Sequence, residues 1–274
     1  MPVVKDAGAL AERFRDAEAL VLIRERTSID DALLSRLPNL KLISQTGRGT
    51  NHIDVEACAR RGVEVAAGTG SPYAPAELTL ALILSAMRRI PQEVAHLRSG
   101  GWQHLLGTTV RGRTLGIFGY GKIGSLVAGY GRALGMRVLV WGREGSQSRA
   151  RNDGYDVGPL FADSDVLSLH LRLTEETRGI VKAADLAQMK PTALLVNTSR
   201  AELIEPGALV AALRAGRPGF AAVDVYEEEP AIADPLLSMD NAVCTPHLGY
   251  VEKDSYELYF GQAFDNVNAF AARS

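Results

Sequence analysis

Short apolar runs alternate with helical patterns along almost the whole chain. The helical patterns include Ala9–Phe14, Ile29–Arg36, Asp54–Arg61 and Ser125–Leu134. The apolar runs predict strands at Ala19–Ile23, Leu40–Ser44, Val63–Ala66, Leu115–Phe118, Val138–Trp141, Val166–Leu171, Ala193–Asn197, Ala221–Val225 and Ala242–Thr245. This alternation is typical of α/β proteins with parallel sheets. It predicts two Rossmann-like domains with doubly wound parallel sheets and a cleft between them.

One predicted helix is apolar on nearly every side. The segment Ala74–Glu77 opens it, because Pro75 suits the first helical position and Glu77 lies near the positive end of the helix dipole. The run from Leu78 to Ile90 then offers little polar surface, which is typical of a helix buried all round. We therefore expect it to lie between domains or between subunits. A last helix, Val251–Ala271, follows the final strand.

A glycine turn lies between the strand Leu115–Phe118 and the helix after it. Gly119, Gly121 and Gly124 fit the pattern G-x-G-x-x-G. The first glycine permits a tight turn, the second lets a pyrophosphate approach the backbone, and the third lets the helix pack close to the strand. This context predicts a dinucleotide site at the helix N-terminus. The alternatives are a structural turn and another nucleotide-type ligand such as a methyl donor.

The composition narrows the classes of partner. The 274 residues are 46% hydrophobic and 23% charged, which suits one large or two modest globular domains. A formal net charge of −2 favours neither nucleic acid nor an anionic membrane as a partner. The histidines are scattered, so we expect no metal. Cys58 and Cys244 suggest reduced thiols in a cytoplasmic protein, and neither a signal peptide nor a membrane-spanning run is evident.

Polar side chains follow three of the predicted strands in the second half of the chain. Arg200, Glu229 and His247 each come shortly after an apolar run. Ligands of open α/β sheets bind beyond the carboxyl ends of the strands, so these side chains could converge on one end of a bound cofactor. They would supply a cation for a carboxylate, a proton donor, and a carboxylate to orient that donor.

Several ordered segments resemble one family. They are Gln45–Gly49, Ala76–Leu80, Gly119–Gly124, Val196–Arg200, Asp224–Pro230 and Thr245–His247. With these segments the chain resembles, over nearly its whole length, the D-isomer-specific 2-hydroxyacid dehydrogenases, which include phosphoglycerate, glycerate, D-lactate and hydroxypyruvate/glyoxylate enzymes. The resemblance implies hydride transfer between NAD(P)H and a small 2-oxo acid to give a D-2-hydroxy acid. It also implies a homodimer in which the apolar helix packs across the dimer.

The resemblance assigns roles to the polar residues. Arg200 matches the arginine that holds the substrate carboxylate and carbonyl, His247 the general acid/base, and Glu229 the carboxylate that pairs with that histidine. Backbone amides around Arg48 and Gly49 match a loop that clasps the substrate carboxylate. The implied cofactor contacts are Gly119, Gly121, Lys122, Ile123, Gly124, Gly142, Arg143, Thr198 and Asp224, the last at the nicotinamide carboxamide.

Some of these assignments have competitors. Glu227 and Glu228 compete with Glu229, which we prefer because the family places its carboxylate immediately before a proline. His170 either lines the cofactor pocket or is a buried structural histidine, and for His52 a structural role is favoured. Arg48 either adds a positive charge at the substrate or is merely exposed, and Arg200 alone could be a surface residue at a strand end.

The end of the second strand of the cofactor domain bears on the choice between NAD and NADP. The acidic residue that binds the adenosine ribose is expected at position 142, where this chain has Gly142, followed by Arg143 and Glu144. Without that acid a 2′-phosphate is not repelled, and Arg143 can pair with it. We therefore expect NADP to be accepted and favoured over NAD; in the alternative, Glu144 binds the ribose of NAD.

The sequence also predicts the domain limits. Residues 1–99 and 249–274 are expected to form a flavodoxin-like substrate domain, and residues 100–248 the dinucleotide-binding domain. The family's first strand has no counterpart before Pro2–Val4, which resembles its second strand, and Tyr155–Leu160 looks short. Three other functions stay open: D-3-phosphoglycerate dehydrogenase, a dinucleotide-sensing corepressor-like protein, and a remnant without activity.

Overall fold

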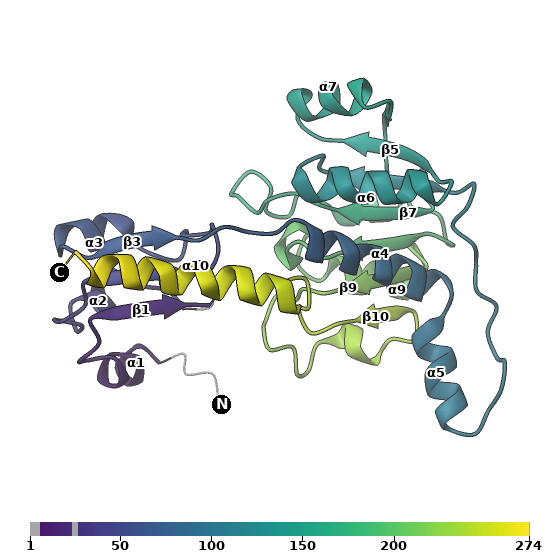
Figure 1. Ribbon diagram of the computed structural model, residues 1–274. Coiled ribbons are helices and arrows are strands. Elements are labelled where there is room, and N and C mark those ends of the chain that lie inside the picture. The colour runs from purple at the N-terminus through teal and green to yellow at the C-terminus, as the bar shows by residue number, and fades with distance from the viewer. Residues whose placement is uncertain (1–5, 24–26, 274) are drawn as a thin grey trace. The chain divides into compact units, whose positions relative to one another are not determined.

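The computed structural model describes residues 6–23 and 27–273 (Figure 1). The chain forms two compact units, one of Met1–Ser71 with Glu252–Ser274 and one of Pro72–Val251. Both contain parallel sheets flanked by helices, which confirms the predicted α/β fold class. Each strand predicted between Ala19 and Thr245 has a counterpart whose ends differ by at most two residues.

The first unit is built on a three-stranded parallel sheet in the order β1-β2-β3. These strands are β1 (Ala19–Leu22), β2 (Leu42–Gln45) and β3 (Glu64–Ala67). The central strand β2 is buried along its length, and α10 (Lys253–Ala271) packs against it. A hydrogen bond from the Ser44 hydroxyl to the Ala263 carbonyl, at 3.0 Å, joins that helix to the strand.

Three short helices of the first unit begin in the same way. They are α1 (Ala7–Arg13), α2 (Asp31–Leu34) and α3 (Val55–Arg60). Asp6, Asp30 and Asp54 precede them, and each aspartate carboxylate accepts a backbone N–H three residues later. Such caps satisfy amides that a helix leaves without partners, so the side chains fix where these helices start.

The second unit is built on a seven-stranded parallel sheet in the order β10-β9-β8-β7-β4-β5-β6. Its strands are β4 (Thr114–Phe118), β5 (Arg137–Trp141), β6 (Asp156–Val157), β7 (Val166–Leu169), β8 (Leu194–Asn197), β9 (Phe220–Val223) and β10 (Ala242–Cys244). The chain moves from β4 toward one edge of the sheet and then returns through β7 toward the other. The switch point between β4 and β7 is where open α/β sheets bind their ligands.

Helices cover both faces of this sheet. On one face lie α4 (Tyr73–Met87) and α6 (Lys122–Ala133), visible in front of the strands in Figure 1. On the other face lie α8 (Ala183–Leu186) and α9 (Ala208–Ala215). Neighbouring residues of one strand face opposite cores, since Leu194 and Val196 belong to one apolar cluster and Leu195 to the other. The unit is therefore a doubly wound sheet, as predicted.

The expected apolar helix differs from the prediction. Arg89 takes a left-handed conformation, with φ of 57°, and divides the segment into α4 and α5 (Ile90–Arg98). Six residues of α4 are buried in this chain, while Leu78, Leu80 and Leu84 are half-exposed and Ala81 is exposed. Burial on all sides is thus not found among the described residues of one chain, where Leu78 and Leu84 pack against the core but are covered only in part.

The boundary between the units also differs from the prediction. Sequence reasoning placed it at residue 99, whereas the chain passes from one unit to the other at Ser71 and Pro72 and returns at Val251 and Glu252. The physical reason is the packing of α4, whose Leu82 and Ile83 join the core formed by β4, β5 and α6. The expected strand Pro2–Val4 lies outside the described residues. No helix in the described ranges is long and apolar enough to cross a membrane.

Candidate active site

The glycine turn joins β4 to α6 at the switch point of the sheet. Gly119 has a φ of 111°, which disfavours residues with side chains, and a Cβ there would lie 2.9 Å from the carbonyl carbon of His170. A Cβ on Gly124 would collide with the Gly119 carbonyl oxygen. Beside Gly121 the space is open. The backbone therefore leaves room for a diphosphate next to Gly121.

The helix α6 begins directly after this turn. Gly121 precedes it and gives no side-chain cap to its first amides. Lys122 is exposed at the first helical position, and Ile123 packs against the apolar core. Uncapped amides and the positive end of the helix dipole bind phosphate groups. These residues fit the pyrophosphate of a dinucleotide.

Two further contacts hold the glycine turn in place. The Tyr120 hydroxyl donates to Asp153 at 2.6 Å, and the Arg149 guanidinium donates to the Tyr120 carbonyl at 2.7 Å. Burial and the Asp153 carboxylate raise the pKa of Tyr120, so its hydroxyl stays protonated. Both partners come from α7 (Glu144–Asn152) or the turn after it. These two hydrogen bonds were not predicted from the sequence.

The end of β5 lies beside the glycine turn in the sheet. Gly142 follows this strand, and Arg143 is the N-cap of α7 without capping it by a side chain. The Glu144 side chain runs back along α7, where it accepts from Ser148 at 3.3 Å and from Arg151 at 3.4 Å. Glu176 has a lowered pKa, chiefly through a hydrogen bond from Thr174 and to a smaller extent through the charge of Arg143.

Three candidate residues lie beyond the carboxyl ends of neighbouring strands. Arg200 follows β8, Glu229 follows β9 and His247 follows β10, and these three strands are neighbours. Because parallel strands end at the same side, the sheet brings the three segments together. The topology thus places the segments that contain these residues at the carboxyl ends of neighbouring strands in the second unit.

His247 and Glu229 are in direct contact. Nδ1 of His247 lies 2.7 Å from one Glu229 oxygen and 2.8 Å from the other. Since an ionised carboxylate only accepts, the imidazole Nδ1–H donates in this pair. Glu229 also accepts the backbone N–H of Tyr226 at 3.3 Å. The histidine side chain is 23% exposed, so the pair is open to a ligand.

Asp224 holds the segment that carries His247. It is fully buried, and one of its oxygens accepts the Thr245 hydroxyl at 2.6 Å and the Leu248 N–H at 2.7 Å. The other accepts the Gly249 N–H at 2.8 Å. His247 itself has a left-handed backbone, with φ of 55°. The Asp224 hydrogen bonds on both sides of it stabilise this uncommon conformation.

The loop after β8 is ordered by its own side chains. Asn197 accepts the Ser199 N–H at 3.0 Å and donates to the Arg200 carbonyl at 2.9 Å. The Thr198 hydroxyl lies 2.8 Å from the Thr79 hydroxyl of α4, and Thr79 donates to a carbonyl of its own helix. Thr198 therefore donates in this pair. Thr79 was not among the residues that sequence reasoning identified.

The loop after β2 in the first unit contains Arg48 and Gly49. The Gln45 side chain donates to the Gly49 carbonyl at 3.1 Å, which closes the loop on itself. Arg48 is exposed. Among the described residues, no protein acceptor takes the backbone N–H of Arg48 or Gly49. The loop thus has donors available for an anion.

His170 and the two cysteines have surroundings that favour a structural role. His170 follows β7, its Nε2 lies 2.9 Å from the Ser168 hydroxyl, and its Nδ1 is buried without a hydrogen bond in the described part of the chain. Burial lowers its pKa to about 4, so it is neutral at pH 7. Burial raises the pKa of both Cys58 and Cys244, which keeps these free cysteines as thiols.

Comparison with known proteins agrees with this geometry. A family model described as D-isomer specific 2-hydroxyacid dehydrogenase, NAD binding domain, matches residues 80–249. The glyoxylate reductase of Aeropyrum pernix is 40% identical over 96% of this chain and 82% of its own length. The D-3-phosphoglycerate dehydrogenase of Archaeoglobus fulgidus is 37% identical over 83% of this chain and 45% of its own length. The crystal structure of a phosphoglycerate oxidoreductase from Vibrio cholerae is 55% identical, with a TM-score of 0.95, over 99% of this chain and 89% of that one.

The second unit is a doubly wound sheet with a glycine turn at its switch point. A histidine–carboxylate pair also lies at the carboxyl ends of its strands. This architecture is that of a dinucleotide-dependent oxidoreductase. The chain belongs to the D-isomer-specific 2-hydroxyacid dehydrogenases. It is an oxidoreductase that uses NAD(P) and acts on the CH–OH group of its donor, interconverting 2-oxo acids and D-2-hydroxy acids. The resemblance stated from the sequence is thereby confirmed.

Proposed function

We propose that Arg200, Glu229 and His247 are the catalytic residues of this enzyme. The observation that carries the proposal is the contact between Nδ1 of His247 and the Glu229 carboxylate. A histidine that donates one N–H to a carboxylate has a fixed orientation and a stabilised imidazolium form, as a general acid requires. Glu227 and Glu228, the competing carboxylates, instead line a cavity beside this segment.

The chemistry divides between cofactor and protein. A nicotinamide dinucleotide, when bound, would supply or accept the hydride at C2 of the substrate. The Arg200 guanidinium holds the substrate carboxylate, since its planar fork matches a carboxylate in two hydrogen bonds. Nε2 of His247 gives its proton to the carbonyl oxygen, which becomes the hydroxyl group. Glu229 keeps its negative charge and stabilises the imidazolium before the proton leaves.

We assign the first unit to the substrate and the second to the dinucleotide. The amides of Arg48 and Gly49 would add hydrogen bonds to the substrate carboxylate, which their lack of acceptors among the described residues supports. In the second unit, the pyrophosphate would bind at Gly121, Lys122 and Ile123, and Thr198 would contact the cofactor through its backbone. Asp224 has a carboxylate lone pair left for the nicotinamide carboxamide, beyond the three hydrogen bonds that it accepts.

We propose NADP as the favoured cofactor. Gly142 presents no carboxylate to a 2′-phosphate, and Arg143 can pair with one. The N-terminus of α7, next to Arg143, has no side-chain cap. Glu144, which would have to bind the ribose of NAD, has its carboxylate turned to Ser148 and Arg151. These contacts favour NADP over the alternative.

We also propose that two copies of the chain form a dimer. The apolar side chains of α5 and the segment after it are exposed, with Trp102 at 73% and Leu106 at 96%. Figure 1 shows α5 and this segment standing away from the sheet of their unit. Together with the half-exposed leucines of α4, they make an apolar surface that a second copy would cover.

The substrate that we propose is a small 2-oxo acid of the glyoxylate or hydroxypyruvate type. The relative with 40% identity is named a glyoxylate reductase, and the segments around the site contain no cluster of basic residues for a substrate phosphate. The second candidate is D-3-phosphoglycerate dehydrogenase, which the names of the other two relatives favour.

A substrate panel tests this proposal. We would follow the loss of NADPH and NADH absorbance with glyoxylate, hydroxypyruvate and 3-phosphohydroxypyruvate. The proposal expects the higher kcat/KM with one of the first two. A higher kcat/KM with the phosphorylated compound would replace it by the second candidate. No turnover of any of the three compounds, together with tight dinucleotide binding, would contradict both candidate activities and favour a dinucleotide sensor.

A further inference from the structure

A cavity of about 500 Å³ lies in the second unit, beside the segment that carries Glu229. One wall comes from α9 and the residues before it, another from the end of β9, and a third from residues 226–236. The volume falls within the usual range of small-molecule sites. Arg200, Asp224 and His247 do not line it, so it is separate from the proposed catalytic residues.

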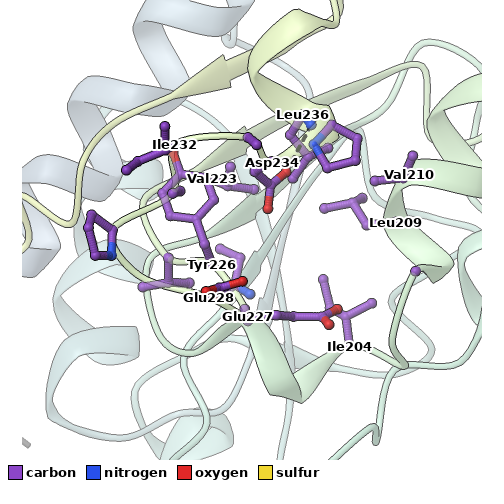
Figure 2. A pocket seen from close by; sticks show the side chains of 18 of the residues that line it. Ile204, Leu209, Val210, Val223, Tyr226, Glu227, Glu228, Ile232, Asp234 and Leu236 are labelled. Carbon is purple, nitrogen blue, oxygen red and sulfur yellow. Dashed lines mark hydrogen bonds between the residues drawn. The ribbon is translucent and has the colours of Figure 1, made fainter. Parts of the chain in front are cut away.

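The walls of this cavity are mostly apolar. Ile204, Leu209, Val223 and Leu236 are buried in the protein and border the hollow. Figure 2 shows Leu209 and Val210 on one side, with Tyr226 and Ile232 across from them. Ile232 is 85% exposed, so the lining includes apolar surface that water can reach. A hydrocarbon group that enters here would remove this apolar surface from water.

The charge around the cavity has one sign. Glu205, Glu227, Glu228 and Asp234 line it, and no lysine or arginine within residues 6–23 and 27–273 does. Neither Glu227 nor Glu228 has an ion-pair partner in the described part of the chain. One carboxylate oxygen of Asp234 accepts the Leu236 N–H at 2.9 Å, which leaves its other oxygen for a ligand. The cavity therefore disfavours acids and phosphates and favours a cation at its exposed, acidic side.

We propose that this cavity is a second binding site, for a small primary amine with an apolar body. The hydrocarbon part would lie between α9 and the 226–236 segment. The ammonium group would lie near Glu227 and Glu228, where both carboxylates are exposed and part of its hydration is kept. The enzyme's own substrates and cofactors are anions, so this site does not duplicate the active site.

Two residues connect the cavity to the catalytic segments. Tyr226 lines it, donates its backbone N–H to Glu229, and donates its hydroxyl to the Thr245 carbonyl at 2.9 Å. Asn197 also lines it and hydrogen-bonds the Arg200 carbonyl. An amine in the cavity would therefore lie against two residues whose hydrogen bonds position Glu229 and Arg200. We expect its binding to change kcat.

Binding of n-hexylamine is the first test, with 1-hexanol and hexanoate as matched neutral and acidic probes. Isothermal titration calorimetry on the wild-type chain should give about tenfold tighter binding for the amine than for the alcohol, as one charge-assisted contact provides. Hexanoate should bind more weakly than either. Equal affinities for the three probes, or no binding of the amine, would overturn the proposal.

Variants place the site on the molecule. The double variant Glu227→Gln with Glu228→Gln should lose about tenfold in hexylamine affinity while 1-hexanol binds as before. Val210→Phe should weaken both by filling the hollow, and Glu175→Gln, an exposed carboxylate outside it, should change neither. If the double variant of Glu227 and Glu228 binds hexylamine as tightly as the wild type, the site is refuted, even if Val210→Phe fails to fold. Hexylamine that binds without changing kcat would refute the connection to Glu229.

Discussion

At the level of single residues, the cofactor preference depends on what stands at position 142. A carboxylate there would repel the 2′-phosphate of NADP and bind the ribose of NAD. Gly142 does neither, and Arg143 beside it offers a positive charge. A side chain at this position would meet the Ser146 Cβ at 3.2 Å, a contact that a small displacement of α7 relieves.

We predict that Gly142→Asp shifts the ratio of kcat/KM for NADPH over NADH toward NADH by about tenfold or more, the value of one lost charged contact. Steady-state kinetics with both reduced cofactors measure this ratio. Gly142→Ala is the matched control, because it adds the Cβ without the charge and should leave the ratio near that of the wild type. A ratio unchanged in the aspartate variant would show that position 142 does not face the 2′ position.

At the level of elements, the end of β7 contains a histidine that the folded chain keeps neutral. Burial lowers the pKa of His170 to about 4, below its ordinary value of 6.5. As the pH falls from 6.5 toward 4, His170 therefore becomes protonated in the unfolded chain but stays neutral in the folded one. Stability linked to His170 is complete above pH 6.5 and is lost across this window, by about 3 kcal/mol in all.

Denaturant unfolding between pH 4 and pH 7 checks this expectation. Trp102 and Trp141 both lie in the second unit, so their fluorescence reports the unit that contains His170. The His170→Gln variant should show a weaker fall in the free energy of unfolding toward low pH than the wild type. Parallel curves for the two proteins would contradict a buried neutral histidine.

The elements also show what a sequence can predict. Apolar runs mark the strands, because strands covered on both faces are apolar throughout. β6 was missed because only two of its residues pair, and the division at Arg89 because the residues on both sides have helical patterns. Arg200, Glu229 and His247 were identified through their positions after strands. The hydrogen bonds of Asp224 were not, since their donors lie 21 to 25 residues away and meet it only through the pairing of β9 with β10.

At the level of the whole molecule, the apolar surface on α4, α5 and the following segment bears on assembly. Leu106 is almost fully exposed in the single chain. We predict that Leu106→Glu weakens the proposed dimer, because a buried charge without a partner opposes association. Light scattering coupled to size-exclusion chromatography should find a dimer for the wild type and a larger monomer fraction for the variant. A monomeric wild-type chain would contradict the proposed dimer.

The reaction depends on the whole enzyme, with His247 as its proposed proton donor. The most direct measurement compares the wild type with His247→Ala in the reduction of the best 2-oxo acid by NADPH, together with cofactor affinity from fluorescence titration. We predict that kcat falls about 10²- to 10⁴-fold, the usual contribution of a general acid, while the cofactor Kd stays close to its wild-type value. A variant that retains its kcat would contradict the assignment of His247 and the proposed pair with Glu229.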